Sequence, residues 1–63
     1  MKFLDLYMAF DRWTLSSEIR VAIIDGDEIE SLSADVSIVL YNYADYEVLG
    51  FDAEYVTLKR RTK

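Results

Sequence analysis

The sequence predicts one small α+β domain, covering residues 1–63, in which two short helices accompany an antiparallel sheet. Three observations lead to this prediction. Apolar side chains recur at helical spacing in residues 3–10. A run rich in β-branched residues, 18–24, ends on an Asp-Gly pair. Two further strand-like runs follow in residues 46–60, on either side of a polar turn.

The first element is a predicted helix at residues 3–10. Its apolar stripe consists of Phe3, Leu6, Tyr7 and Phe10. These positions lie on one face because they follow the helical repeat. Asp5 lies in the first turn, where the helix dipole favours a carboxylate. Residues 11–17 contain Trp13 and several hydroxyl-bearing side chains, and they predict a loop.

The second element is a predicted strand at residues 18–24, in which β-branched residues recur at alternate positions. The Asp25-Gly26 pair after it predicts a hairpin with a type I′ turn, which needs positive φ at both central residues. The returning arm, residues 27–31, is short and polar apart from Ile29. We expect a weak edge strand there, whose charges discourage pairing with another sheet.

Residues 34–43 fit either a helix or a strand. Ser33 is a residue type that caps helices, and four apolar residues after it repeat at helical spacing: Val36, Val39, Leu40 and Tyr43. The β-branched content of the same segment favours a strand. Because the cap and the spacing agree, we predict a short helix.

The chain closes on a predicted hairpin. Residues 46–51 and 55–60 have the composition of strands, and residues 52–54 form the turn between them. Gly50 marks a bulge in the first of these strands. The predicted order of elements is therefore α-β-β-α-β-β.

The composition excludes the commonest catalytic and metal-binding chemistries. The chain has no His and no Cys, which removes imidazole bases, thiolate nucleophiles, disulfides and the usual zinc ligands together. A domain of this size also hardly encloses the cleft that a pair of catalytic carboxylates requires. We therefore predict a protein that is not an enzyme and that carries no cofactor and no metal.

Charge is distributed unevenly along the chain. The formal net charge is −5, and residues 21–58 hold nine acids with no Lys or Arg. The bases lie near the two ends, and residues 59–63 form a basic tail. Such a field repels nucleic acid and attracts basic protein surfaces. We therefore predict a protein partner with a basic surface and no direct contact with nucleic acid.

The predicted contact region combines acids with exposed tyrosines, whose rings bury area while their hydroxyls find polar partners. The candidate partner-binding residues are Asp25, Asp27, Glu28, Glu30, Tyr41, Asp45, Tyr46, Glu47, Asp52 and Glu54. The acids allow three interpretations: a solvated surface, a mimic of nucleic acid and a loop for a cation. The first acidic run lacks the ligand spacing of an EF-hand, and we interpret it as a hairpin turn.

The apolar content is high for so short a chain, at 52% hydrophobic residues. A thin core leaves part of this surface exposed, and exposed apolar patches mark interaction sites. A second copy of the chain is therefore an alternative partner. The longest apolar run, residues 38–41, is far shorter than a membrane span. With no export signal at the start either, we predict a cytoplasmic protein without a membrane partner.

Four features together cover nearly the whole chain: a helix at the start, the strand at residues 18–24, a polar turn with a short helix, and the closing phrase Asp-Tyr-Glu-Val-Leu-Gly-Phe-Asp-Ala-Glu-Tyr-Val-Thr-Leu at residues 45–58. This pattern resembles the small acidic accessory proteins of phages and prophages of Gram-positive bacteria. The resemblance implies an inhibitor or modulator in the cytoplasm of the host cell, in the group that includes anti-CRISPR proteins. We expect it to bind and block a host protein that handles nucleic acid. The alternative is a homo-oligomeric accessory protein with no host target.

Overall fold

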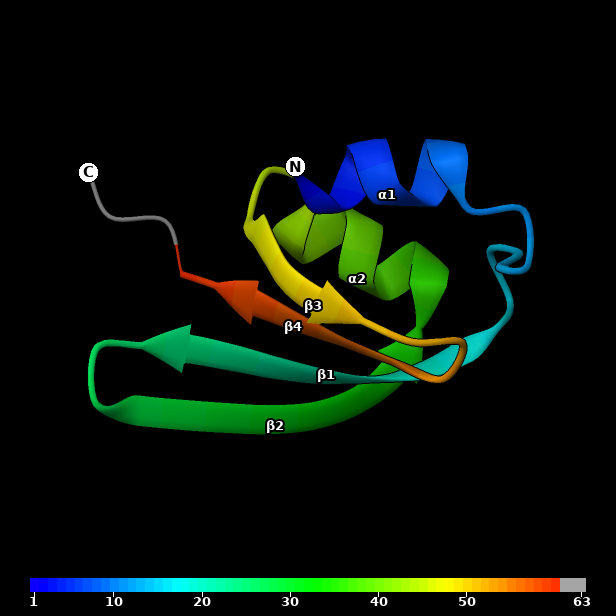
Figure 1. Ribbon diagram of the computed structural model, residues 1–63. Helices are drawn as coiled ribbons and strands as arrows, with labels where there is room; N and C mark the ends of the chain where they lie inside the picture. The colour runs from blue at the N-terminus through cyan, green and yellow to red at the C-terminus, as the bar shows by residue number, and fades with distance from the viewer. Residues whose placement is uncertain (61–63) are drawn as a thin grey trace.

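Two helices cover one face of a four-stranded sheet in the computed structural model, which describes residues 1–60 (Figure 1). The elements are α1 (Phe3–Ala9), β1 (Glu18–Asp25), β2 (Glu28–Asp35), α2 (Val36–Tyr43), β3 (Glu47–Phe51) and β4 (Tyr55–Lys59). The predicted α+β class and the predicted order α-β-β-α-β-β are confirmed. Of the predicted basic tail, residues 61–63 lie outside the described part of the chain.

The sheet is mixed, and the prediction of a wholly antiparallel sheet is wrong for one pair of strands. Its strand order is β2-β1-β4-β3, in which both hairpins are antiparallel and β1 runs parallel to β4. Parallel neighbours need a crossover connection. Helix α2 provides it, because it crosses the sheet between the outer strands β2 and β3 (Figure 1). The second hairpin then places β4 in the centre of the sheet, beside β1.

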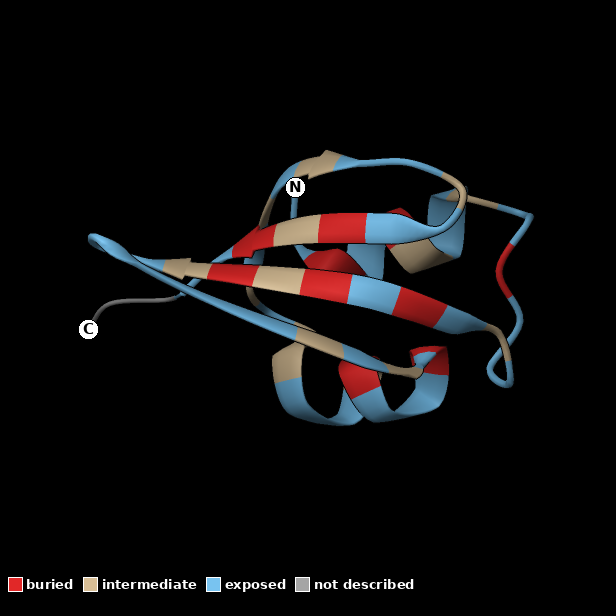
Figure 2. Cartoon of the chain, turned by 90° about the horizontal axis from the view of Figure 1, so that it is seen from below, coloured by how far each residue is buried: buried red, intermediate tan, exposed pale blue. Residues whose placement is uncertain are grey.

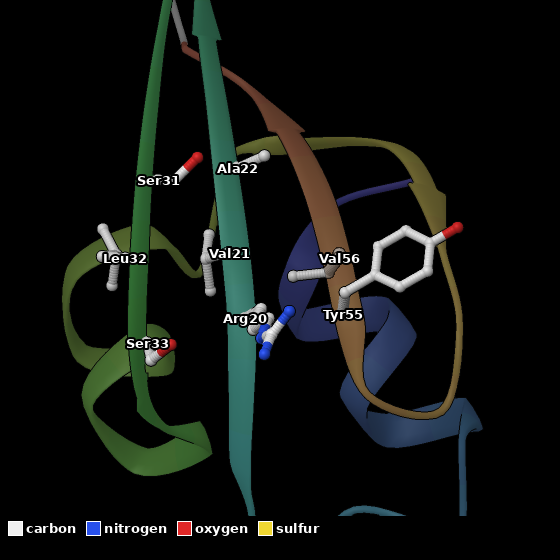
Figure 3. A pocket seen from close by; sticks show the side chains of 8 residues that line it. All are labelled: Arg20, Val21, Ala22, Ser31, Leu32, Ser33, Tyr55 and Val56. Carbon is white, nitrogen blue, oxygen red and sulfur yellow. The ribbon is translucent and has the colours of Figure 1, made fainter.

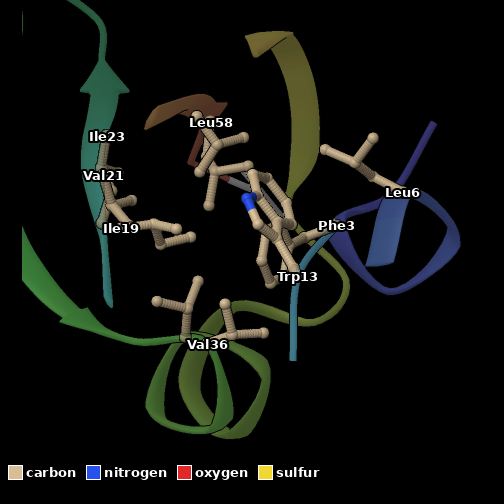
Figure 4. Close-up of a cluster of buried hydrophobic side chains, with 10 residues drawn as sticks. Phe3, Leu6, Trp13, Ile19, Val21, Ile23, Val36 and Leu58 are labelled. Carbon is tan, nitrogen blue, oxygen red and sulfur yellow. The ribbon is translucent and has the colours of Figure 1, made fainter. Parts of the chain in front are cut away.

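The core lies between the helices and the sheet (Figure 4). Burial alternates along β1 and β4, as expected for strands with one face packed and one face open (Figure 2). The buried residues are Phe3, Leu6, Trp13, Ile19, Val21, Ile23, Val36, Val39, Val56 and Leu58. The predicted stripe of α1 is therefore confirmed at its two buried positions, and its other two residues pack against the core while partly exposed.

Trp13 joins three parts of the molecule. Its indole Nε1–H donates a hydrogen bond of 2.8 Å to the carbonyl of Ala53, in the turn between β3 and β4. Its ring lies edge-on to Phe10, with centroids 5.0 Å apart, and tilted to Phe3 at 5.9 Å. The predicted loop of residues 11–17 is confirmed, but it carries a core side chain and is not simply a connection.

The boundary between β2 and α2 differs from the prediction. Ser33 lies inside β2 and does not cap the helix, because the strand pairs with β1 as far as Asp35. This longer pairing places Leu32 and Ala34 on the helix side, where they pack against the core. The burial of two apolar side chains outweighs the preference of one serine for a cap.

The first backbone amides of α2 find their hydrogen-bond acceptors in another part of the chain. The Val36 N–H donates to the Ser17 carbonyl at 2.8 Å, and the Ser37 N–H donates to the Leu15 carbonyl at 3.0 Å. These two amides are among the four that a helix N-terminus leaves without partners inside the helix. The loop before β1 therefore caps α2, and no side chain makes the capping bond.

The first hairpin is longer than predicted. Strand β2 has eight residues and matches β1 along its whole length, so it is an edge strand as expected but not a short one. The turn has Gly26 and Asp27 as its central residues, and only Gly26 has positive φ, at +62°. This pattern belongs to a type II′ turn, and the predicted type I′ turn is wrong.

We predict that Gly26→Ala destabilises the protein by about 1–2 kcal/mol, because an L-residue at this φ brings its Cβ close to the next carbonyl oxygen. Nothing lies within 4 Å of a Cβ built at Gly26 or at Gly50, so the cost is conformational. Gly50→Ala is the matched control, and we expect it to be near neutral. Urea unfolding of both variants measures the difference, and equal midpoints would contradict the prediction.

The second hairpin follows the prediction closely. Its register shifts between Val48 and Gly50, which confirms the bulge. The turn at residues 52–54 is fixed by Asp52, whose carboxylate accepts from the Ala53 N–H at 2.7 Å. The Asp52 N–H in turn donates to the carbonyl of Tyr55 at 2.8 Å, which closes the strands on each other.

Candidate interaction surface

The sheet face opposite the helices is uncovered, and its centre is built from small side chains. The strand registers place Ser31, Ala22, Thr57 and Gly50 in one row across the four strands. Beside this row lies a shallow hollow of about 320 Å³, lined by Arg20, Val21, Ala22, Ser31, Leu32, Ser33, Tyr55 and Val56 (Figure 3). A wide, shallow depression of this kind suits contact with another chain better than enclosure of a small molecule.

The two edges of the sheet differ. The outer edge of β3 is covered by the start of the chain: Lys2 pairs with Glu47 in an antiparallel bridge, and the Val48 N–H donates to the Met1 carbonyl at 2.7 Å. The bulge in β3 interrupts that edge further. Coverage and bulges are two of the ways in which proteins keep an edge strand from pairing with other chains.

The outer edge of β2 has neither kind of protection. The strand is eight residues long, contains no Pro or Lys, and pairs with β1 without a register shift. Within residues 1–60, no backbone group donates to or accepts from this outer edge. It is the longest stretch of unpaired strand backbone in the described chain.

The direction of the free backbone groups follows from the bonds on the other side of β1. The Arg20 N–H donates to the Glu54 carbonyl at 2.9 Å, and the Ile24 carbonyl accepts from the Arg60 N–H at 2.8 Å. The backbone N–H and C=O groups of Arg20 and Ile24 therefore point toward β4 and away from β2. Backbone groups alternate in direction along a strand. Ile24, Ala22 and Arg20 thus make no backbone bonds to β2. The residues opposite them, Ile29, Ser31 and Ser33, direct their own backbone groups to the free outer edge of β2.

Four of the predicted contact acids gather at the tip of the first hairpin. Asp25, Asp27, Glu28 and Glu30 are all exposed. Within residues 1–60, the single ion pair joins Asp25 to Arg60, with 3.5 Å between the charged atoms. The other three carboxylates of this acidic hairpin make no ion pair with a described cation and keep their attraction for basic groups outside the chain.

The remaining predicted acids lie elsewhere. Glu54 lies beside Arg20, near the start of β1, and its neighbour Asp52 is in the same turn. The distance along β1 from Arg20 to Asp25 corresponds to about 17 Å. Glu47 lies at the hairpin end of the sheet but on the opposite edge strand, where its register partner is Lys59. Asp45 precedes it in the connection from α2. The structure therefore divides the predicted contact residues and does not gather them on one face.

The predicted tyrosines also separate. Tyr41 is 89% exposed, on the outer side of α2. Tyr46 is partly buried and packs edge-on against Tyr43, with ring centroids 4.9 Å apart. Tyr43 packs against the core, as expected for an inward-facing residue. Tyr55, which is not among the candidate contact residues, lies on the open sheet face and is 47% exposed.

Sequence reasoning missed the open face of the sheet and the full length of β2, although it predicted an edge strand there. The available signal was the alternation of Leu32 and Ala34 with Ser31 and Ser33, which is the period of a strand with one packed and one open face. The predicted strand ends at Ser31, and Ser33 and Ala34 are predicted to start a helix, because Ser33 fits an N-cap. With the strand recognised, the two serines would have been placed on an uncovered surface.

In residues 1–60 no polar or charged residue is buried, and no group of three or more acids is placed to hold a metal ion. No helix in that range is long and apolar enough to cross a membrane. The carboxylates in that range are all exposed to solvent.

Comparison with known proteins found no matching family model, no matching curated protein and no matching solved structure.

Proposed function

We propose that this chain acts as a binding protein without catalytic activity, which recognises a basic surface on a partner protein and blocks it. One observation carries the proposal. The acidic hairpin projects three exposed carboxylates, on Asp27, Glu28 and Glu30, that make no ion pair within residues 1–60. Charges arranged in this way speed the encounter with an oppositely charged protein and select against acidic ones.

The class of partner protein follows from a common function of basic protein surfaces, which is to bind nucleic acid. Proteins that handle nucleic acid carry clusters of Lys and Arg that neutralise phosphates. A protein with exposed carboxylates competes for such a surface, and the run of nine acids without a base in residues 21–58 supports this reading. The proposed role is therefore that of an inhibitor or modulator of a host protein that handles nucleic acid, of the kind that phages and prophages encode. Anti-CRISPR proteins are one example of such inhibitors.

We predict that replacing Asp27, Glu28 and Glu30 with Lys abolishes capture of the partner and leaves the domain folded, because all three side chains are exposed. The control replaces Asp5, Asp11 and Glu18 with Lys, none of which is a candidate contact residue. These acids are also exposed, lie away from the hairpin tip, and change the net charge equally. Affinity capture from the lysate of a Gram-positive host, at low and at high salt, compares both variants with the parent chain.

Capture of one nucleic-acid-handling protein that is lost at high salt and lost in the hairpin variant supports the proposal. Screening by salt weakens interactions between exposed charges, so salt-insensitive capture contradicts it. Equal loss in both variants would assign the effect to net charge alone and would remove the hairpin from the contact.

Self-association is the second candidate function, and a different surface favours it. The outer sides of the two helices expose large apolar residues: Leu4, Met8, Ile38 and Tyr41. Burial of such side chains in a dimer would lower the free energy of association. Sedimentation at high micromolar concentration separates the two functions, because a strictly monomeric chain contradicts self-association.

A further inference from the structure

We infer that β2 receives an extended basic segment of the partner protein as an added strand, an inference that rests on the proposed function and specifies its mode of binding. Figure 1 shows β2 as the outermost strand of the sheet. Its outer edge offers the N–H and C=O groups of Ile29, Ser31 and Ser33 at regular spacing. Adding a strand to such an edge is an established way for a sheet to bind a peptide.

The contrast between the two edges supports this assignment. The chain covers the outer edge of β3 with Met1 and Lys2 and bends it with a bulge. It leaves the longer and more regular edge of β2 open. The carboxylates of β2 discourage pairing with an acidic strand but not with a basic one, so we assign this edge to the binding of a basic partner.

Charge identifies the occupant. Strand β2 carries Glu28, Glu30 and Asp35 and no base. Pairing it with β2 of a second copy would bring three carboxylates from each chain into one ladder without a cation, and like charges across strands are destabilising. A basic segment replaces that repulsion with attraction. A partner segment therefore fits this edge better than a second copy does.

The register specifies the pattern of the segment. Glu28 and Glu30 lie on the helix side of β2, because their partners on β1 are Asp25 and the buried Ile23. Their backbone faces β1, so residues opposite them in an added strand that runs antiparallel to β2 form the closer, non-hydrogen-bonded pairs. Basic residues two positions apart in the added strand would each meet one of these carboxylates. The residues between them would lie over Ile29, Ser31 and Ser33, beside the hollow.

The open face restricts what those intervening residues are. Arg20 lines the hollow together with Ser31 and Ser33. Ile29, which is 68% exposed, precedes these serines on the same face of β2. A second row of cations would be repelled by Arg20. Small or apolar residues are therefore expected on this side, and the predicted motif alternates basic residues with uncharged ones.

The probe is a synthetic peptide of alternating lysine and threonine, of the same length as β2 and blocked at both ends. Two further versions carry N-methyl groups, one on every threonine amide and one on every lysine amide. With the lysines opposite Glu28 and Glu30, the threonine amides face β2 and the lysine amides face away. Methylating the threonine amides should therefore weaken binding more than tenfold, while methylating the lysine amides should leave it within about twofold.

Two variants of the full chain complete the design. Ser31→Pro removes an outward N–H and leaves the bonds between β1 and β2 intact, which an edge strand tolerates. Its matched control, Ser31→Ala, changes the same side chain and keeps the N–H. We expect the proline variant to bind the unmethylated peptide at least tenfold more weakly than the alanine variant. Heteronuclear NMR on the labelled chain should also show slowed amide exchange at Ile29, Ser31 and Ser33 when the peptide binds.

Each outcome bears on a different statement. Strand addition is supported if binding is lost selectively with the threonine-methylated peptide and if the amides of Ile29, Ser31 and Ser33 are protected from exchange. Neither readout depends on whether the proline variant folds. Equal binding of both methylated peptides overturns strand addition and leaves recognition of basic partners standing. No binding of any of the lysine peptides overturns strand addition and counts against the proposed function as well.

Discussion

Replacing Trp13 with alanine is expected to unfold most of the protein at 25 °C. The side chain is 6% exposed, stacks with two other aromatic rings, and bonds to the β3–β4 turn through Nε1. Truncating a buried Trp to Ala typically costs about 3–5 kcal/mol. The single hydrophobic core of a chain this short rarely supplies more than about 3–5 kcal/mol of stability. The loss is therefore comparable with the whole stability of the domain.

Far-UV circular dichroism during urea unfolding measures this effect, since the variant lacks the chain's one Trp as a fluorescent probe. Trp13→Phe is the control. It keeps an aromatic ring in the core but loses part of the buried indole and the hydrogen bond to Ala53, the bond itself costing about 1 kcal/mol. An alanine variant as stable as the phenylalanine variant would show that packing around Trp13 contributes little.

The second large effect is expected at Leu58. Its side chain is fully buried, and its strand lies in the centre of the sheet. Leu58→Ala should destabilise the protein by about 2–5 kcal/mol, because the lost contacts leave a cavity that a rigid sheet closes only in part. The midpoint of urea unfolding should fall accordingly, with an unchanged slope.

Leu49→Ala is the matched control for Leu58→Ala, since it makes the same chemical change in the same hairpin. Leu49 lies at the bulge and is 49% exposed, so we expect its truncation to cost less than about 1 kcal/mol. Similar losses at both positions would contradict the placement of β4 in the core.

Local patterns in the sequence were enough to predict most of the elements. The apolar stripe of α1 follows from its spacing, and the strand β1 follows from β-branched residues at alternate positions. Gly26 marks the first turn, because its positive φ favours glycine, and Gly50 coincides with the bulge. These features depend on neighbours within a few residues, which is the range over which periodicity and turn chemistry act.

The predicted interaction site was only partly determined by the sequence. The acids at the hairpin tip were identified and are exposed, since charged residues after a strand rarely fold inward. Their separation from Asp52 and Glu54 depends on β1 and β4 running parallel, which places the second turn beside Arg20. Nothing in either segment alone specifies that direction.

The sequence by itself determined the α+β class, the order of the elements and the acidic field, because each arises from local composition. Only the tertiary structure decided where β2 ends, since pairing with β1 buried Leu32 and Ala34 and overrode the capping preference of Ser33. It alone also covered one edge of the sheet with the N-terminus and left the other open. The physical reason is that strand pairing and edge coverage join residues far apart in the chain. Their energies depend on packing that no local pattern encodes.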